Sequence, residues 1–69
     1  MDSLLINGER QPFPGPQSLL QLLKDCGYDP TSQRFIVAIN EILIPQGQWA
    51  GTQVSPGDCI DIMGAITGG

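Results

Sequence analysis

The chain has 69 residues, with three Lys or Arg against seven Asp or Glu, so its formal net charge is −4. We expect one small domain, because chains rarely divide into domains below about 100 residues. The scattered basic residues argue against binding to nucleic acid or to an anionic membrane surface. The sequence shows neither a signal peptide nor an apolar run near the roughly 20 residues that span a bilayer. We therefore expect a cytoplasmic protein.

Cysteine and histidine usage limits the chemistry of the chain further. There is no His, and the two Cys residues, Cys26 and Cys59, lie far apart without a C-x-x-C pair. These are too few for a disulfide framework, a structural zinc site or a Cys-ligated iron–sulfur cluster. We predict that both are small buried or half-buried side chains without a metal or redox role.

The N-terminal residues are typical of a β-hairpin. Residues 4–6 are apolar, and the Asn7-Gly8 pair that follows tolerates positive φ angles. Residues 9–13 are then the returning strand. Pro12 within it indicates an edge position, because proline cannot donate to the hydrogen-bond ladder.

One helix is predicted over residues 18–26. Ser18 is a good N-cap, and Gln21 three positions later completes a capping box. The helical spacing places four apolar side chains on one face, namely Leu19, Leu22, Leu23 and Cys26. Gly27 is placed to end the helix in the left-handed conformation.

The second half of the chain contains three more predicted strands. Residues 35–39 are almost all apolar, and a turn at residues 40–41 leads into residues 42–44. A loop with one helical turn around Trp49 follows. A tight turn over residues 55–58 precedes the last strand, residues 59–63.

This order of elements predicts an α+β fold in which one helix covers one face of a small mixed sheet, with the first and last strands parallel. Trp49 and Phe35 are expected to fill the edge of the core. The predicted core consists of Leu4, Ile6, Leu19, Leu22, Leu23, Phe35, Val37, Ile39, Ile60 and Ile62.

No catalytic constellation is present in the sequence. There is no His to transfer protons near neutral pH, no Ser or Cys nucleophile beside a base, and no phosphate-binding glycine loop. Asp58 and Asp61 are close in sequence, but the first reads as a turn residue and the second as a solvent-facing strand residue. We expect no enzymatic activity, no bound cofactor and no metal site.

The C-terminus is the chemically unusual feature. We divide the chain into a domain at residues 1–63 and a flexible tail at residues 64–69, which reaches about 20 Å when extended. Thr67 and Gly68 could thread a narrow channel, and the Gly69 carboxylate could be activated as an acyl-adenylate by a partner and ATP. The alternative is a frayed terminus without function.

The whole chain resembles the sulfur carrier proteins of thiamine biosynthesis, which are ThiS-like proteins with the ubiquitin-like β-grasp fold. Several short pieces in the same order carry the resemblance. They are Leu5-Ile6-Asn7, Leu19-Leu20-Gln21-Leu22-Leu23, Val37-Ala38-Ile39-Asn40, Ile44-Pro45, Gln48-Trp49, Gly57-Asp58 with Ile60 and Ile62, and Gly68-Gly69.

The resemblance implies a mechanism and a set of partners. An adenylating enzyme related to ubiquitin-activating enzymes would use ATP and magnesium to adenylate Gly69. Sulfur from a cysteine desulfurase persulfide or a similar donor would then displace AMP and leave a thiocarboxylate. Thiazole synthase would consume this sulfur in making the thiazole ring, and the carrier itself would catalyse nothing.

Three alternatives remain open. The small subunit of molybdopterin synthase has the same fold and terminal Gly-Gly, but commonly has prolines before the tail, where this chain has none. A ubiquitin-like protein modifier would use Gly69 to form an isopeptide bond. A plain interaction module would not need Gly69.

The sheet face opposite the helix is a candidate docking surface. It should present Leu5, Ala38, Cys59, Asp61 and Met63. An apolar patch rimmed by acids fits an enzyme with a basic rim. The alternative is a set of ordinary exposed apolar side chains, which are common on protein surfaces.

Overall fold

A mixed sheet of five strands forms the framework of the protein. The structure, a computed structural model, describes residues 2–67, and for residues 65–67 it describes the backbone alone. Its elements in chain order are β1 (Ser3–Ile6), β2 (Glu9–Pro12), α1 (Leu19–Asp25), β3 (Gln33–Ile39), β4 (Ile42–Ile44), the 3-10 helix η1 (Gln46–Gly51) and β5 (Cys59–Thr67).

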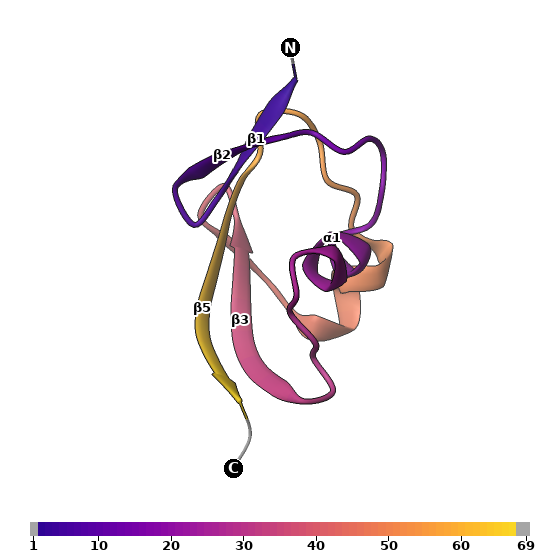
Figure 1. The fold of residues 1–69 in the computed structure, drawn as a ribbon. Helices are drawn as coiled ribbons and strands as arrows, with labels where there is room; N and C mark the ends of the chain where they lie inside the picture. The colour runs from indigo at the N-terminus through magenta and orange to yellow at the C-terminus, as the bar shows by residue number, and fades with distance from the viewer. Residues whose placement is uncertain (1, 68–69) are drawn as a thin grey trace.

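The strand order in the sheet is β2-β1-β5-β3-β4. The first and last strands, β1 and β5, are parallel, while the other neighbouring pairs are antiparallel. Figure 1 shows α1 lying on one side of this sheet. The predicted α+β arrangement is confirmed, as is the edge position of β2, the strand that ends at Pro12.

Two tight turns join the antiparallel hairpins at the predicted positions. Asn7 and Gly8 have φ angles of 52° and 84°, and Asn40 and Glu41 have φ angles of 52° and 71°. Asparagine tolerates this left-handed region because its short polar side chain can form local hydrogen bonds. The side chain of Asn40 accepts a hydrogen bond from the Cys59 N–H at 3.0 Å, so this turn is also tied to the start of β5.

Helix α1 begins as predicted and ends slightly earlier. The Ser18 hydroxyl accepts a hydrogen bond from the Gln21 N–H at 3.1 Å. The reciprocal half of the capping box is not formed, because the Gln21 side chain donates to Asp25 at 2.9 Å instead. Gly27 has the expected left-handed conformation, with a φ angle of 93°.

The predicted place of Cys26 on the buried helix face is wrong. The helix ends at Asp25, and Cys26 is the C-cap residue, directly before the left-handed Gly27. Its side chain is exposed. Helical spacing therefore holds for the three leucines of α1, which are buried, but does not extend to Cys26.

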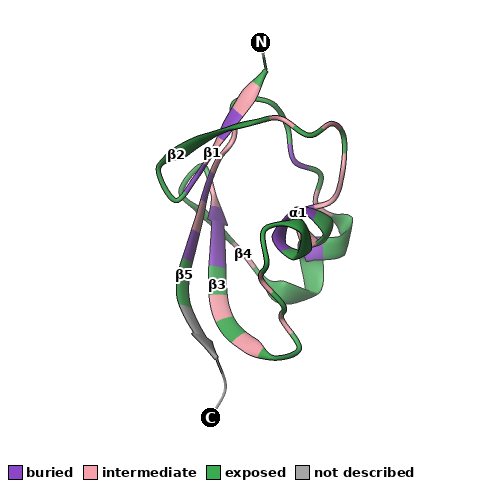
Figure 2. Cartoon of the chain, viewed as in Figure 1, coloured by how far each residue is buried: buried purple, intermediate pink, exposed green. Residues whose placement is uncertain are grey.

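The core lies between α1 and the sheet (Figure 2). Eight of the ten predicted core residues are buried, while Phe35 and Ile39 are partly buried at its margin. Val54 also belongs to the core and was not predicted. It is held there because its N–H donates to the Gln17 carbonyl at 3.1 Å, which ties the segment after η1 to the start of α1.

Aromatic side chains close one end of the core, as expected. Trp49 is only 2% exposed and stacks on Phe35 with ring centroids 5.2 Å apart. Its indole N–H donates to the Ile44 carbonyl at 2.8 Å. This bond satisfies the polar atom that burial of a Trp would otherwise leave unpaired.

Candidate functional site

The last strand, β5, leads to the C-terminus and differs from the prediction in length. It continues to Thr67 instead of ending at Met63. The reason is that Arg34 and Gln33, at the start of β3, pair with Ile66 and Thr67. Pairing with a strand that is distant in sequence cannot be read from the local sequence of residues 64–67.

A β-bulge interrupts this pairing at Gly64. Met63 pairs with Ile36, and the next pair along the strands joins Ile66 to Arg34, so two residues of β5 lie opposite the single residue Phe35. Gly64 has a φ angle of 71°. A bulge with glycine in the left-handed region is a recurrent way to insert one extra residue and to bend the strand.

Glycine is favoured at this bulge because of its backbone conformation, and not because a side chain would clash with neighbouring atoms. A Cβ atom added to Gly64 would meet none of the described atoms within 4 Å, its chain neighbours aside. The positive φ angle, by contrast, is one that other L-residues adopt only at a cost. The sequence-based description of residues 64–69 as a tail missed this function of Gly64.

The structure describes only part of the predicted reactive C-terminal segment. The backbone of Thr67 is the last described position of β5, and Gly68 and Gly69 lie outside the described residues. In Figure 1, β5 lies beside the antiparallel β3 and ends at the end of the molecule opposite the start of β1. The end of β5 therefore lies away from the β1–β2 hairpin.

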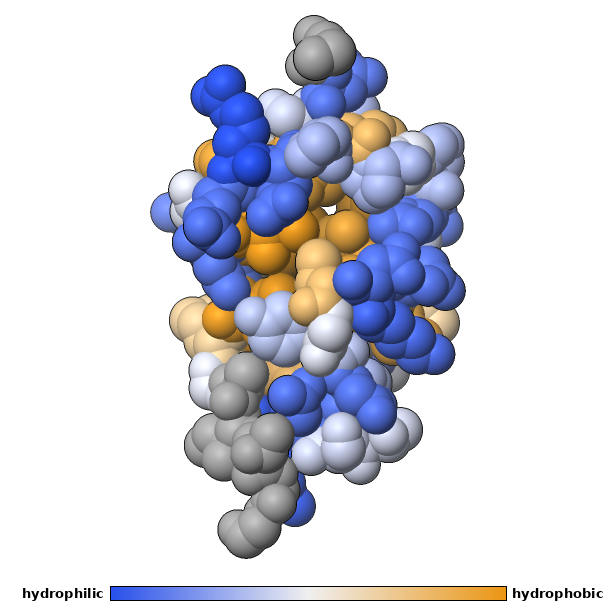
Figure 3. All heavy atoms as spheres, viewed as in Figure 1, coloured by the Kyte–Doolittle hydropathy of each residue, from blue (hydrophilic) through white to orange (hydrophobic). Residues whose placement is uncertain are grey.

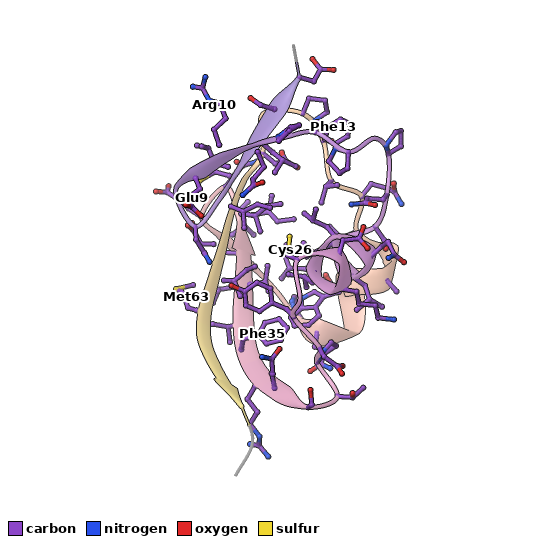
Figure 4. All side chains as sticks on the ribbon, in the orientation of Figure 1. Glu9, Arg10, Phe13, Cys26, Phe35 and Met63 are labelled. Carbon is purple, nitrogen blue, oxygen red and sulfur yellow. The ribbon has the colours of Figure 1, made fainter. Side chains whose placement is uncertain are left out.

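The face of the sheet opposite α1, here called the open face, contains the five predicted docking residues. Strand register places Leu5 beside Cys59, and Ala38 beside Asp61. Met63 is 43% exposed on this face, and Ala38 is only 5% exposed. Figure 4 shows Met63 pointing away from the helix side and Phe35 pointing toward it. Ala38 therefore contributes little accessible surface.

Two larger apolar side chains on the open face were not predicted. Ile36 pairs with Met63 and is 54% exposed, and Leu43 pairs with Ala38 and is 63% exposed. The alternation of residues along β3 and β4 would have found both, because side chains two positions apart point to the same face. With them, the patch extends across the four strands β1, β5, β3 and β4, around the half-buried Asp61.

The turn before β5 uses Asp58 structurally, as the sequence indicated. Its carboxylate accepts hydrogen bonds from the Ser55 N–H at 2.8 Å and from the Asn40 side chain at 3.2 Å. Both oxygens are therefore occupied in holding the turn. Residues 2–67 contain no group of three or more His, Cys, Asp or Glu side chains placed to hold a metal ion.

Comparison with known proteins agrees with this geometry. The model of the ThiS family matches residues 4–69, which is nearly the whole chain. The chain belongs to the ThiS family. No curated protein matches it. Among solved structures it is similar to the thiamine biosynthesis protein (ThiS) of Geobacter metallireducens, with 20% identity, a TM-score of 0.73, and coverage of 97% of this chain and 99% of that one.

The structural similarity confirms the ubiquitin-like β-grasp fold of this ThiS-family chain. Within the described residues, no helix is long and apolar enough to span a membrane.

The two cysteines occupy different places. Cys59 lies half-buried on the open face, while Cys26 lies by a groove between the end of α1 and the β1–β2 turn. On the face of the molecule drawn in Figure 3, apolar atoms at the centre are surrounded by polar side chains.

The environment of Cys26 opposes thiolate formation. Partial burial raises the pKa of its thiol, and the neighbouring carboxylate of Asp25 raises it further. A thiol held in its protonated form is a poor nucleophile and metal ligand. The exposure of Cys26 differs from the prediction of a buried or half-buried side chain.

Proposed function

We propose that this ThiS-family chain is a sulfur carrier whose C-terminal Gly69 is converted to a thiocarboxylate for thiazole formation in thiamine biosynthesis. The observation that carries the proposal is the family match over residues 4–69, which includes the terminal Gly68-Gly69 pair. The absence of His from the sequence agrees with a chain that supplies a reactive end and leaves catalysis to its partners.

The chemistry proceeds in two displacements. An oxygen of the Gly69 carboxylate attacks the α-phosphorus of ATP, and pyrophosphate leaves. A sulfur nucleophile then attacks the carbonyl carbon of the acyl-adenylate, and AMP leaves. If the sulfur arrives as a protein persulfide, a second thiol must cleave the resulting sulfur–sulfur bond to release the thiocarboxylate.

The adenylating enzyme is the proposed occupant of the open face. A partner that encloses the C-terminus must also hold the strand that leads to it, and β5 presents Asp61 and Met63 on this face. The exposed Ile36 and Leu43 enlarge the apolar area. Because the carrier has a net charge of −4, a basic rim on the enzyme would increase the rate of encounter.

The C-terminal chemistry is tested by intact mass after incubation with the adenylating enzyme, ATP, magnesium and a sulfur donor. We expect one oxygen-to-sulfur exchange that maps to Gly69. A variant with one Ala appended after Gly69 should not be modified, while Gln11→Ala, on the exposed edge strand β2, should react normally. Modification of the extended variant at an unchanged rate would refute the proposal.

The recipient is tested with the purified thiocarboxylate. Sulfur transfer to the product of thiazole synthase supports the proposed pathway, and transfer only to molybdopterin synthase would favour that alternative. Gly-Gly branches on target lysines would instead identify a protein modifier.

The open face has a matched pair of residues for testing the docking. Ile42 and Leu43 are adjacent in β4 and almost equally exposed, at 65% and 63%. Ile42 pairs with Ile39 on the helix side, and Leu43 pairs with Ala38 on the open face. We expect Leu43→Ser to weaken binding to the adenylating enzyme at least roughly tenfold, as loss of an interface anchor does, and Ile42→Ser to leave it unchanged. Equal effects would refute docking through the open face.

A further inference from the structure

The first part of β3 has no partner strand on the side that faces β4. Strand β3 spans residues 33–39, but β4 pairs only with residues 37–39. Strand β4 ends at Ile44, and Pro45 then leads into η1. Because proline has no N–H, it cannot continue the ladder. The edge of β3 that precedes Val37 is therefore open.

The backbone of Phe35 is directed toward this open edge. Directly after β3, the Asn40 N–H donates to the Cys59 carbonyl at 2.8 Å, so even-numbered positions face β5. The Gln33 N–H donates instead to the Asp29 carbonyl at 2.9 Å. Backbone groups alternate in direction along a strand, so the N–H and C=O of Phe35 face the β4 side. Among the described residues, Phe35 has a paired residue in neither β5 nor β4.

A groove lies beside this free edge. It has a volume of about 380 Å³. Ile36 and Leu43 border it and are 54% and 63% exposed on the open face. Phe35 points to the helix side (Figure 4) and stacks there on Trp49, which also lines the groove. Unpaired backbone and accessible apolar side chains thus occur together, as they do where a peptide adds a strand to a sheet.

A positive charge lies next to the groove. Arg34 is exposed, and it shares a face of β3 with Ile36 because side chains two positions apart point the same way. Directly opposed side chains of an antiparallel pair also share a face. A strand that pairs with Phe35 therefore places one side chain against Ile36 and another, two positions later, against Arg34. The complementary choices are an apolar residue followed, after one intervening residue, by an acidic one.

We propose that the groove at Phe35 receives an extended segment of a partner protein with the pattern apolar–any–acidic, which adds to the edge of β3 by antiparallel pairing. This interaction goes beyond the proposed function, since it does not require chemistry at Gly69. The groove is continuous with the open face through Ile36 and Leu43, so a protein docked on that face supplies such a segment from the same side.

NMR titration of the full-length, isotope-labelled chain tests the pairing. The probe is the blocked peptide acetyl-Thr-Ile-Thr-Glu-Thr-amide, in which Ile-Thr-Glu provides the pattern. One control peptide is N-methylated at the central Thr, the residue opposite Phe35, and a second has Lys in place of Glu. The protein variant is Arg34→Glu. Its matched control is Arg10→Glu, which changes an equally charged, exposed residue on the distant edge strand β2.

We expect the probe to shift the Phe35 amide resonance saturably and to slow its hydrogen exchange. N-methylation should weaken binding at least roughly fivefold, because one backbone hydrogen bond is lost. Arg34→Glu should reverse the preference to the Lys peptide, and Arg10→Glu should leave the preference unchanged.

An unmoved Phe35 amide at the solubility limit of the peptide would overturn the proposal, as would equal binding of the N-methylated peptide. Shifts confined to β2 would show that the peptide uses the other edge of the sheet. Shifts of Phe35 that follow protein concentration without any peptide would assign the groove to a second copy of this chain. Either of these results also contradicts the proposal.

Discussion

Leu23 is a fully buried residue of α1, with 0% exposure, so truncation to alanine tests the position of the core. The change removes three carbon atoms, each of which contributes about 0.8 kcal/mol when buried. A residual cavity of about 50 Å³ would add about 1 kcal/mol. We therefore expect Leu23→Ala to lower the free energy of unfolding by about 3.5 kcal/mol.

This loss is large for so small a domain. A chain of 69 residues is expected to have a free energy of unfolding of about 3.5–10 kcal/mol. If Leu23→Ala is too unstable to measure, Leu23→Val removes one carbon and should cost about 1 kcal/mol.

Urea unfolding followed by tryptophan fluorescence is a suitable assay. Trp49 is the single tryptophan of the chain, and it is buried against Phe35. Leu43→Ala is the matched control, because Leu43 is 63% exposed on the open face and should change stability by less than about 0.5 kcal/mol. A loss below about 1 kcal/mol for Leu23→Ala would show that the helix packs on the sheet with another face. An equal loss for Leu43→Ala would show that the assay does not separate core from surface truncations.

Three further predictions concern local interactions. Because Asn40 has a φ angle of 52°, Asn40→Ala should lower stability by about 1 kcal/mol more than Asn40→Gly, and equal denaturation midpoints would contradict this. Hydrogen bonds from Thr31 lower the pKa of Asp29, so its stabilising contribution is complete above the unfolded-state pKa and is lost as the pH falls through the lower folded-state pKa. Carboxyl NMR titration of Thr31→Ala should show that pKa rising, and an unchanged value would refute the assignment. Asp25→Asn should lower the raised pKa of Cys26 and speed its alkylation near neutral pH; an unchanged rate would exclude the effect of Asp25.

The sequence predicted those elements whose cause is local. The Asn7-Gly8 turn, the Ser18 N-cap and the Gly27 helix end each depend on the conformational preference of one or two residues, and each is confirmed. The apolar spacing within α1 was also reliable, because residues three and four positions after Leu19, namely Leu22 and Leu23, lie on the same side of a helix as Leu19. The error at Cys26 arose where this periodicity was extended past the last helical residue.

Surface composition was predicted less completely than the core. Strand alternation placed the predicted residues on the open face, but the prediction left out the exposed Ile36 and Leu43. It also included Ala38, whose side chain is almost fully buried. How much of a side chain remains exposed depends on the neighbouring strands and their register, and the order β2-β1-β5-β3-β4 was only partly evident from the sequence.

The sequence by itself determined the fold class, the hairpin turns, the helix and its buried face. These features depend on backbone preferences and apolar periodicity among residues that are close together in the sequence. Only the tertiary structure decided how the C-terminal segment is held. Strand β5 continues to Thr67 because β3, some thirty positions earlier in the chain, offers pairing partners to Ile66 and Thr67. The function of Gly64 follows from that pairing, because a β-bulge is an extra residue in one strand relative to its partner and cannot form without a partner strand.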